Sequence, residues 1–403
     1  MDTVTRRRFL LASGVLGAGA LAAGATQLSW HDVTAAAKSN PLPADANILV
    51  LVTLYGGNDS LNTVIPYADP AYHRARPDIA YAPEAVLHLD DQLGLNPALK
   101  GLYKLWQGKH LAILRGVGYP QPDHSHFRSM DIWQTASPTA PVSTGWIGRW
   151  LDATGTDPLR SVSVGATLPP LAVGAKSVGS SLPVGALRMP KGPLAARFPG
   201  LGRPDSTDTA AQSAAARGDS DFLLVARTLG PKTTAEKLPA AGAGSGGDLG
   251  AQLDVVKACI TAGAPTRVYA VSLGGFDTHA DEKGTQQALL GELDTAVSGF
   301  LTDLAGDPNG RKVVLAAYSE FGRRVAANAS DGTDHGTAGT VLVAGTPVHG
   351  GFYGEQPSLT RLTDGDLIAT TDFRAVYGTL LGRVLNTDPA KVLDRVPPAI
   401  PFV

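Results

Sequence analysis

Residues 48–54 read Ile48-Leu49-Val50-Leu51-Val52-Thr53-Leu54, and Gly56 and Gly57 follow closely. An unbroken run of β-branched and apolar residues is typical of a strand buried on both faces, as in the centre of a parallel sheet. Comparable runs recur at residues 111–114, 267–273, 313–318 and 340–344. Together these runs predict a sheet of several buried strands.

Two helical patterns separate these runs. Apolar residues recur at three- and four-residue steps between residues 289 and 304, and a further helix is expected at residues 249–262. Alternation of buried strands with helices predicts an α/β fold, with a layered, mostly parallel sheet and helices on both faces. In such folds, functional sites form at the carboxyl ends of the strands.

The expected domain is residues 47–403, with a loop-rich insertion around residues 141–248. There, short apolar pieces alternate with Gly and Pro, and the stretch ends in a Gly-rich segment before the expected helix. Residues 26–46 are polar and Ala-rich and are expected to form a spacer.

Residues 1–25 have the form of a twin-arginine export signal. Arg6, Arg7 and Arg8 precede an apolar run, residues 10–23, that is rich in Gly and Ala. This run is too short and too weakly hydrophobic to span about 30 Å of hydrocarbon, so cleavage is expected rather than anchoring. We therefore expect the twin-arginine translocase to export a protein that becomes periplasmic or extracellular and keeps no transmembrane segment. The alternative is a basic tail followed by an apolar helix.

Composition argues against several classes of function. The chain has 34 Lys and Arg against 36 Asp and Glu, and this slight acidity argues against nucleic acid as a partner. The single cysteine, Cys259, lies in an apolar helical context and is expected to be buried. No dinucleotide fingerprint or cysteine cluster is present in the sequence, which disfavours a redox enzyme.

Carboxylates and imidazoles gather just after the predicted strands. Carboxylate oxygen and neutral imidazole nitrogen are donors that suit one or two divalent ions such as Zn²⁺, Mn²⁺ or Ca²⁺. His349 is a further candidate ligand, or an exposed turn residue. Each Asp would otherwise be an ordinary turn or helix-capping residue. The other candidates are Asp59, Asp277, His279, Glu320, Asp334 and His335.

A second cluster, residues 123–131, follows the run at 111–114 and is expected to enter a helix. Backbone N–H groups at the helix start, together with Arg128 and two histidines, would bind an anionic group. Ser125 or Ser129 would then be a nucleophile, or each would cap the helix, since no Gly-x-Ser-x-Gly elbow is present.

Jointly, the motifs resemble an exported bacterial family known as domain of unknown function 1501. The resemblance runs in order along nearly the whole chain, from residue 6 to about residue 354. Besides the twin-arginine leader, it rests on residues 56–62, 124–127, 131–135, 145–149, 276–279, 319–323 and 332–336.

That family is similar to the alkaline phosphatase and sulfatase superfamily, whose α/β members use one or two metals to hydrolyse or transfer phosphate and sulfate esters. The resemblance implies that Asp59, Asp334 and His335 bind one metal. It places Asp277 and His279, with His349, at the other. The chain departs from the superfamily pattern because Asp277 and His279 are two residues apart instead of four. Asp334 also follows the Ser319-Glu320-Phe321 segment instead of a strand.

The resemblance implies that His126 or a neighbouring serine occupies the nucleophile position. The leading hypothesis is an exported metal-dependent hydrolase acting on a small anionic ester or a glycan-linked substrate. Its alternative is a secreted or surface-associated binding or assembly protein that keeps the fold without the chemistry. In the first reading, the expected catalytic residues are Ser125, His126 and Glu320, with Glu320 as ligand or base, and the expected substrate-binding residues are Asn58, Arg128 and Arg323.

Overall fold

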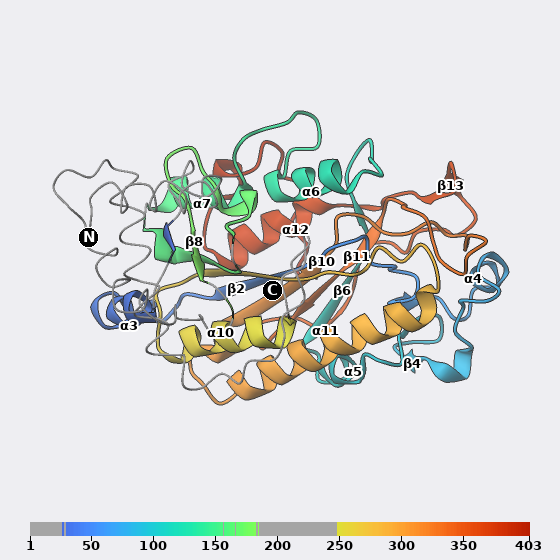
Figure 1. The fold of residues 1–403 in the computed structure, drawn as a ribbon, viewed down its shortest axis with the longest axis horizontal. Helices are drawn as coiled ribbons and strands as arrows, with labels where there is room; N and C mark the ends of the chain where they lie inside the picture. The colour runs from blue at the N-terminus through green and yellow to red at the C-terminus, as the bar shows by residue number, and fades with distance from the viewer. Residues whose placement is uncertain (1–25, 28–29, 156, 166, 183, 185–247) are drawn as a thin grey trace, which may run out of the picture.

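The structure is a computed structural model that describes residues 26–403 apart from 28–29, 156, 166, 183 and 185–247. The expected export signal, residues 1–25, lies outside the described residues, as does most of the expected insertion beyond residue 182. The described part is a central sheet with helices on both faces (Figure 1). The prediction of a layered α/β fold is therefore confirmed.

The main sheet has ten strands in the spatial order β1-β8-β7-β9-β2-β10-β11-β6-β12, with β15 beside β6. Among the described strands of this sheet, every pairing is parallel except the two that β11 makes. The bounds are Thr26–Gln27 (β1), Ile48–Leu54 (β2), Leu111–Gly118 (β6), Ser161–Val164 (β7), Ser180–Leu182 (β8), Val268–Leu273 (β9), Val313–Tyr318 (β10), Gly339–Ala344 (β11), Gly351–Tyr353 (β12) and Thr371–Asp372 (β15).

The runs read from the sequence form five neighbouring strands of this sheet. The run at 48–54 is β2, which lies between β9 and β10, and the other four are β6, β9, β10 and β11. All seven residues of β2 are buried, as expected for a strand covered on both faces.

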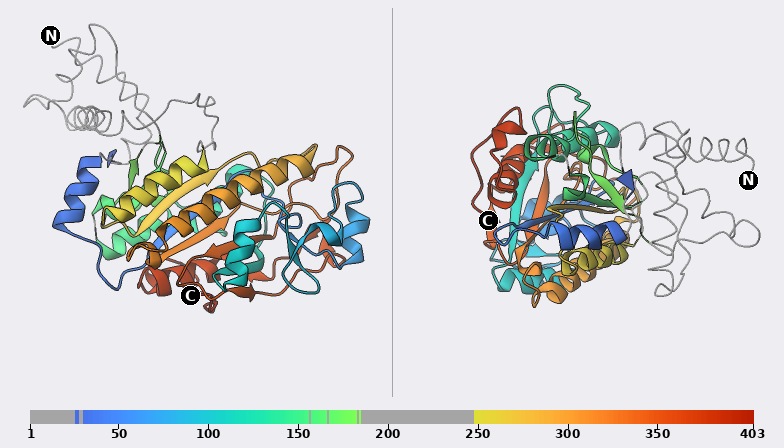
Figure 2. Two further views of the ribbon diagram at one scale, coloured as in Figure 1. Left: turned by 90° about the horizontal axis from the view of Figure 1, so that it is seen from below. Right: turned by 90° about the vertical axis from the view of Figure 1, so that its left-hand side faces the viewer.

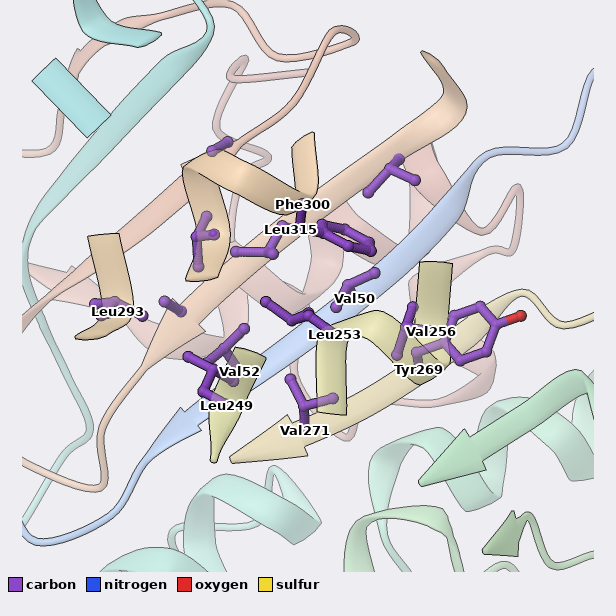
Figure 3. Packing of buried hydrophobic residues seen from close by; sticks show 14 of the residues in the cluster. Val50, Val52, Leu249, Leu253, Val256, Tyr269, Val271, Leu293, Phe300 and Leu315 are labelled. Carbon is purple, nitrogen blue, oxygen red and sulfur yellow. The ribbon is translucent and has the colours of Figure 1, made fainter. Parts of the chain in front are cut away.

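Side chains alternate between two core layers. Val50 and Val52 of β2 pack with α10 (Leu249–Thr261) and α11 (Glu282–Leu304), as Figure 3 shows. Leu49 and Leu51 point to the other face, which is covered by α6 (His126–Thr135), α7 (Trp146–Thr154) and α12 (Phe373–Thr379). Figure 2 shows these helical layers from two further sides. Each fully buried Val or Leu contributes roughly 1.5–3 kcal/mol, so both layers hold the sheet in place.

Smaller elements surround the sheet. Helix α5 (Lys100–Gln107) packs beside α11, and a three-stranded sheet joins β3 (Val64–Ile65), β5 (Gly94–Leu95) and β4 (Leu87–His88). The remaining elements include α3 (Trp30–Ser39), α4 (Pro70–Ala75), β13 (Leu362–Thr363) and β14 (Asp366–Leu367).

The described part of the expected insertion is more regular than its sequence indicates. It supplies α7, and it adds β7 and β8 to the main sheet, where β7 pairs with β9. These strands are only three or four residues long, so a pattern search cannot distinguish them from apolar pieces of a loop. The expected spacer likewise contains α3.

Two other expectations concern burial and membrane contact. Cys259 is buried in α10, where burial raises the pKa of its thiol to about 12, so its role as a packing residue is confirmed. Among the described helices, none combines the length and the apolar character that a membrane span requires.

Candidate metal centre

The sheet topology brings distant residues to one edge. Because β2, β9 and β10 are parallel, the loops that follow them leave from the same edge. Strand β11 is antiparallel, so the residues before it, including His335, lie at that edge as well. The loop after β6 enters α6 at His126, and the loop after β9 carries Asp277 and His279.

Three imidazoles point at one carboxylate oxygen. Oδ1 of Asp277 lies 3.0 Å from Nε2 of His279, 3.0 Å from Nε2 of His335 and 3.4 Å from Nε2 of His126. The Nε2 atoms of His279 and His335 are 2.9 Å apart. His126, Asp277 and His335 each offer a ligand atom within 4.8 Å of those of the other two. The structure thus brings His335 to Asp277 and His279, although the resemblance assigned His335 to a different metal from those two.

The Nδ1 protons of two imidazoles are already committed. Nδ1 of His126 lies 2.8 Å from Oε1 of Glu320, and Nδ1 of His335 lies 2.8 Å from the carbonyl oxygen of His124. Both partners only accept, so in the neutral rings Nδ1 donates and Nε2 carries a lone pair. Two imidazole lone pairs therefore face the same oxygen of Asp277. A cation placed among these atoms would remove the repulsion between them.

Glu320 lies beneath His126 and is buried. Its Oε1 accepts hydrogen bonds from His126 Nδ1 and from the backbone N–H of Gly56, both at 2.8 Å, and its Oε2 accepts one from Ser319 Oγ at 3.0 Å. These bonds fix the ring of His126 and its tautomer. The structure thus places Glu320, expected as ligand or base, where it positions His126.

Arg323 is buried beneath the site and holds its backbone. Its guanidinium donates to the carbonyl oxygens of Gly57 (2.7 Å), Thr333 (2.8 Å) and Phe276 (2.9 Å), and to Oδ1 of Asp277 (2.8 Å). Although burial opposes ionisation, the hydrogen bond and the positive charge of Arg323 lower the pKa of Asp277 to about 2. Asp277 is therefore an anion at neutral pH.

Gly56 allows the close packing on which Asp277 depends. Its φ is +116°, and a Cβ at this position would lie 2.4 Å from the backbone nitrogen of Asp277. Only glycine accepts both the left-handed backbone and the contact without strain.

The protonation of the histidines also follows from their surroundings. Burial lowers the pKa of His335, so its ring is neutral at pH 7. The hydrogen bond to Glu320 raises the pKa of His126, although burial opposes this effect. A hydrogen bond from Asn328 lowers the pKa of Asp334, which lies 3.4 Å from Nδ1 of His279. Ionised carboxylates and neutral imidazoles are the forms that bind a metal.

Asp59, a predicted metal ligand, lies in a different cluster. Both of its oxygens bind Arg76, with 2.5 Å between Oδ2 and Nη1 and 3.0 Å between Oδ1 and Nη2. The Arg76 and Asp59 side chains are fully buried. Burial and the nearby Asp59 raise the pKa of Glu282, which contacts this pair, to about 9. The structure does not bring Asp59 to the imidazoles.

His349 lies at the opposite edge of the sheet. It follows the end of antiparallel β11, and its backbone N–H donates to Phe402 (2.9 Å). The turn before it is bonded to His110, just ahead of β6. The structure therefore does not bring His349 to the candidate metal centre. The residues around His349 in the sequence do not indicate that β11 is antiparallel, which is what separates His349 from the centre.

The residues expected to bind substrate have other partners. Arg323 is enclosed as described, and Asn58 is buried, with its Oδ1 accepting from Gln286 (2.8 Å) and Thr63 (3.1 Å). Arg128 pairs with Asp131 at 2.5 Å. Arg324, the residue after Arg323, is more accessible than Arg323, with 40% of its side chain exposed.

The candidate serines differ from each other. Ser129 is buried and its Oγ donates to the carbonyl oxygen of Asp123 (2.6 Å). Ser125 is exposed at the N-terminus of α6, and its side chain makes no capping hydrogen bond to that helix. The structure thus leaves Ser125 as the more accessible hydroxyl.

Sequence reasoning missed two supporting residues. Asn328 donates to the carbonyl oxygen of His279 (3.0 Å) and to Oδ1 of Asp334 (3.3 Å), and the backbone oxygen of His124 orients His335. The position of His124 beside His126 was a usable signal, whereas Asn328 lies in a loop without a distinguishing motif.

These residues fit a metal ion. The Nε2 atom of His126 is buried and has no hydrogen-bond partner among the residues that the structure describes. The donor set of imidazole nitrogens and a carboxylate suits Zn²⁺ or Mn²⁺. His126, Asp277 and His335 are the ligands that the geometry favours, with His279 and Asp334 beside them.

Comparison with families finds a match to the model described as protein of unknown function (DUF1501), over residues 232–395. That region contains β9, α11, β10, β11 and α12, and hence Asp277, Glu320 and His335. This match agrees with the family resemblance read from the motifs over residues 232–395. A search of curated proteins finds no match to the sequence.

Several solved structures are similar in fold. A protein in the alkaline phosphatase superfamily from Vibrio parahaemolyticus is 10% identical, with a TM-score of 0.42, over 90% of this chain and 74% of that chain. The C-terminal periplasmic domain of EcEptC from Escherichia coli is 11% identical, with a TM-score of 0.40, over 88% and 90%. Alkaline phosphatase from the Antarctic bacterium TAB5 is 11% identical, with a TM-score of 0.34, over 76% and 94%.

Proposed function

Because residues 232–395 match the model of the DUF1501 family, which is defined without a known function, we propose a function from the geometry of the site. The proposal is a metal-dependent hydrolase that acts on a phosphate or sulfate ester. The observation that carries it is the convergence of the Nε2 lone pairs of His126 and His335 on one oxygen of Asp277.

In this proposal, different residues bind the metal, position its ligands and attract the substrate. His126, Asp277 and His335 hold the ion, with His279 and Asp334 as further donors. At this position they would hold a divalent ion, which would supply polarisation of an ester oxygen and a lower pKa for a bound water. Glu320 holds the ring of His126, and Arg323 holds Asp277. Arg324 is placed to attract an anionic group, and Ser125 is an accessible hydroxyl at the edge of the site.

Metal content is the first test. The purified full chain should contain one or two equivalents of metal by elemental analysis when no chelator is used. His335→Ala and Asp277→Ala should lose the metal, whereas His349→Ala, at the opposite edge, should retain it. Chelation should lower the melting temperature of the wild type and of His349→Ala, and it should leave that of the two site variants unchanged.

Activity is the second test. The metal-loaded chain should hydrolyse 4-nitrophenyl phosphate or 4-nitrophenyl sulfate, and the site variants should not. Metal binding without hydrolysis of any ester would instead favour the alternative, a secreted binding or assembly protein that keeps the fold. A chain that holds no metal in any of the four forms would contradict the proposal.

We also propose export by the twin-arginine pathway to the periplasm or beyond. Support comes from the sequence of residues 1–25, with Arg6, Arg7 and Arg8 before an apolar run. Replacing these three arginines by lysine keeps the charge and should retain the protein in the cytoplasm. Cell fractionation with an antibody against the chain measures the result, and unchanged export would contradict the pathway.

A further inference from the structure

A cavity of about 420 Å³ lies beside the candidate metal centre. Phe321 forms the boundary between the two, because it lines the cavity and its ring lies 4.9 Å from that of His126 and 4.8 Å from that of His335. His124, whose backbone orients His335, also lines the cavity. A volume of this size is typical of sites that take a small organic molecule.

The walls of the cavity are largely apolar, and their charges are negative. Tyr119, Phe321, Leu367 and Ile368 supply apolar surface. Of the described residues that line it, Asp364 and Asp366 are acidic, and none is a lysine or an arginine. This composition disfavours a second anionic group on a ligand and favours a positive one.

Asp366 is the residue that points most directly to a ligand. It is 4% exposed, and its Oδ2 lies 2.7 Å from Nε2 of His124. Its Oδ1 is buried and takes no hydrogen bond, and Arg324 approaches it only at ion-pair distance, with 3.5 Å to Nε. A buried carboxylate oxygen without a donor is costly unless another group compensates its charge.

We propose that this cavity binds an organic cation, an ammonium group carried on an apolar body. The carboxylate of Asp366 attracts the charge, and the rings of Tyr119 and Phe321 supply the aromatic surface that ammonium groups favour. On the proposed function, on which this step rests, the cation is the organic part of an ester whose phosphate or sulfate lies at the metal centre.

Binding tests the cavity independently of catalysis. The probes are benzyltrimethylammonium, benzyl alcohol and benzoate, titrated calorimetrically into the full chain with and without chelator. We expect the cation to bind at least tenfold more tightly than the alcohol. In the presence of chelator, benzoate should bind the most weakly of the three probes. Benzyltrimethylammonium has no lone pair, so it cannot bind through the metal.

Variants test whether the preference for the cation over benzyl alcohol arises in the cavity. Asp366→Asn should weaken the cation about tenfold and leave benzyl alcohol unchanged, which a general loss of folding would not do. Asp91→Asn, in an exposed loop outside the cavity lining, is the charge-matched control and should change neither. Should Asp366→Asn fail to fold, Ile368→Trp at the half-exposed cavity wall should weaken all probes by filling the space.

A second measurement separates this inference from the proposed function. The substrates are aryl phosphates that carry an aminomethyl, a methyl or a carboxyl group at the same ring position. Preferential turnover of the aminomethyl ester supports both proposals, and cation binding without any turnover supports the cavity alone. Equal binding of cation and alcohol, tighter binding of benzoate to the chelated chain, or displacement of the cation by Ca²⁺ at equal concentration would overturn the inference.

Discussion

Oε1 of Glu320 and Nδ1 of His126 are 2.8 Å apart, which fixes the face that His126 presents to Asp277. The carboxylate is buried and also accepts from Gly56, so it cannot turn towards the site without losing both bonds. A group held in this way acts on a metal through the ligand that it orients.

Glu320→Gln should therefore weaken metal binding without removing it. Glutamine keeps the size and an acceptor oxygen, but it loses the charge that raises the pKa of His126. We expect metal affinity to fall about 10- to 100-fold, as is usual when the partner of a metal-binding histidine is changed. In the metal-free protein, NMR titration should show a lower pKa for His126. Glu355→Gln, at an exposed position, should change neither quantity.

Arg323 and Arg324 provide a matched pair of substitutions. Arg323→Lys replaces a fork that holds four loop carbonyls, including that of Gly56, and Asp277 by a single ammonium group. We therefore expect a loss of about 3 kcal/mol or more in unfolding free energy. Arg324→Lys should cost less than about 1 kcal/mol, because its side chain is partly exposed. Urea denaturation measures both, and equal losses would contradict the assignment of Arg323 to the scaffold.

Substituting two glycines with positive φ distinguishes the cost of backbone strain from the cost of a steric clash. Gly263 has φ +78° and no atom within 4 Å of a built Cβ, so Gly263→Ala should cost only about 1–2 kcal/mol. Gly56→Ala adds a collision with the backbone of Asp277, so it should cost more and should also weaken metal binding. Thermal unfolding with metal titration checks this difference, and retention of full metal affinity by Gly56→Ala would contradict it.

Glu282 should make stability depend on pH. Burial and Asp59 raise its pKa to about 9 from 4.5, so the folded state holds a proton that the unfolded state releases. The contribution of Glu282 to the free energy of unfolding is fully present below pH 4.5 and is lost as the pH rises towards 9. The slope is at most about 1.4 kcal/mol per pH unit. Glu282→Gln should flatten this part of the curve, which urea unfolding from pH 5 to 9 measures, and an unchanged slope would contradict the assignment.

Much of the fold could be predicted because buried parallel strands leave continuous apolar runs. The runs at 48–54 and 313–318 match β2 and β10 residue for residue. Short edge strands such as β7 bury few residues, so they leave no comparable signal.

The candidate site was harder to predict because it depends on the direction of each chain segment. Asp277 and His335 could be selected from the sequence because their loops were expected at one edge of the sheet. His349 could not be excluded without knowing that β11 is antiparallel, and Asp59 could not be assigned without knowing that Arg76 lies against it. In the irregular segment at 323–324, the sequence does not show which arginine points inwards.

The central position of β2 has a consequence for how the chain matures. This strand leaves the ribosome more than 200 residues before either of its neighbours, β9 and β10. Its neighbours in the sheet cannot pair with it until residues 268–318 have been made, and such long-range pairing is slow to form. The nascent chain therefore carries an aggregation-prone segment until β9 and β10 emerge, and a chain cut before β10 would lack the partner that completes its core.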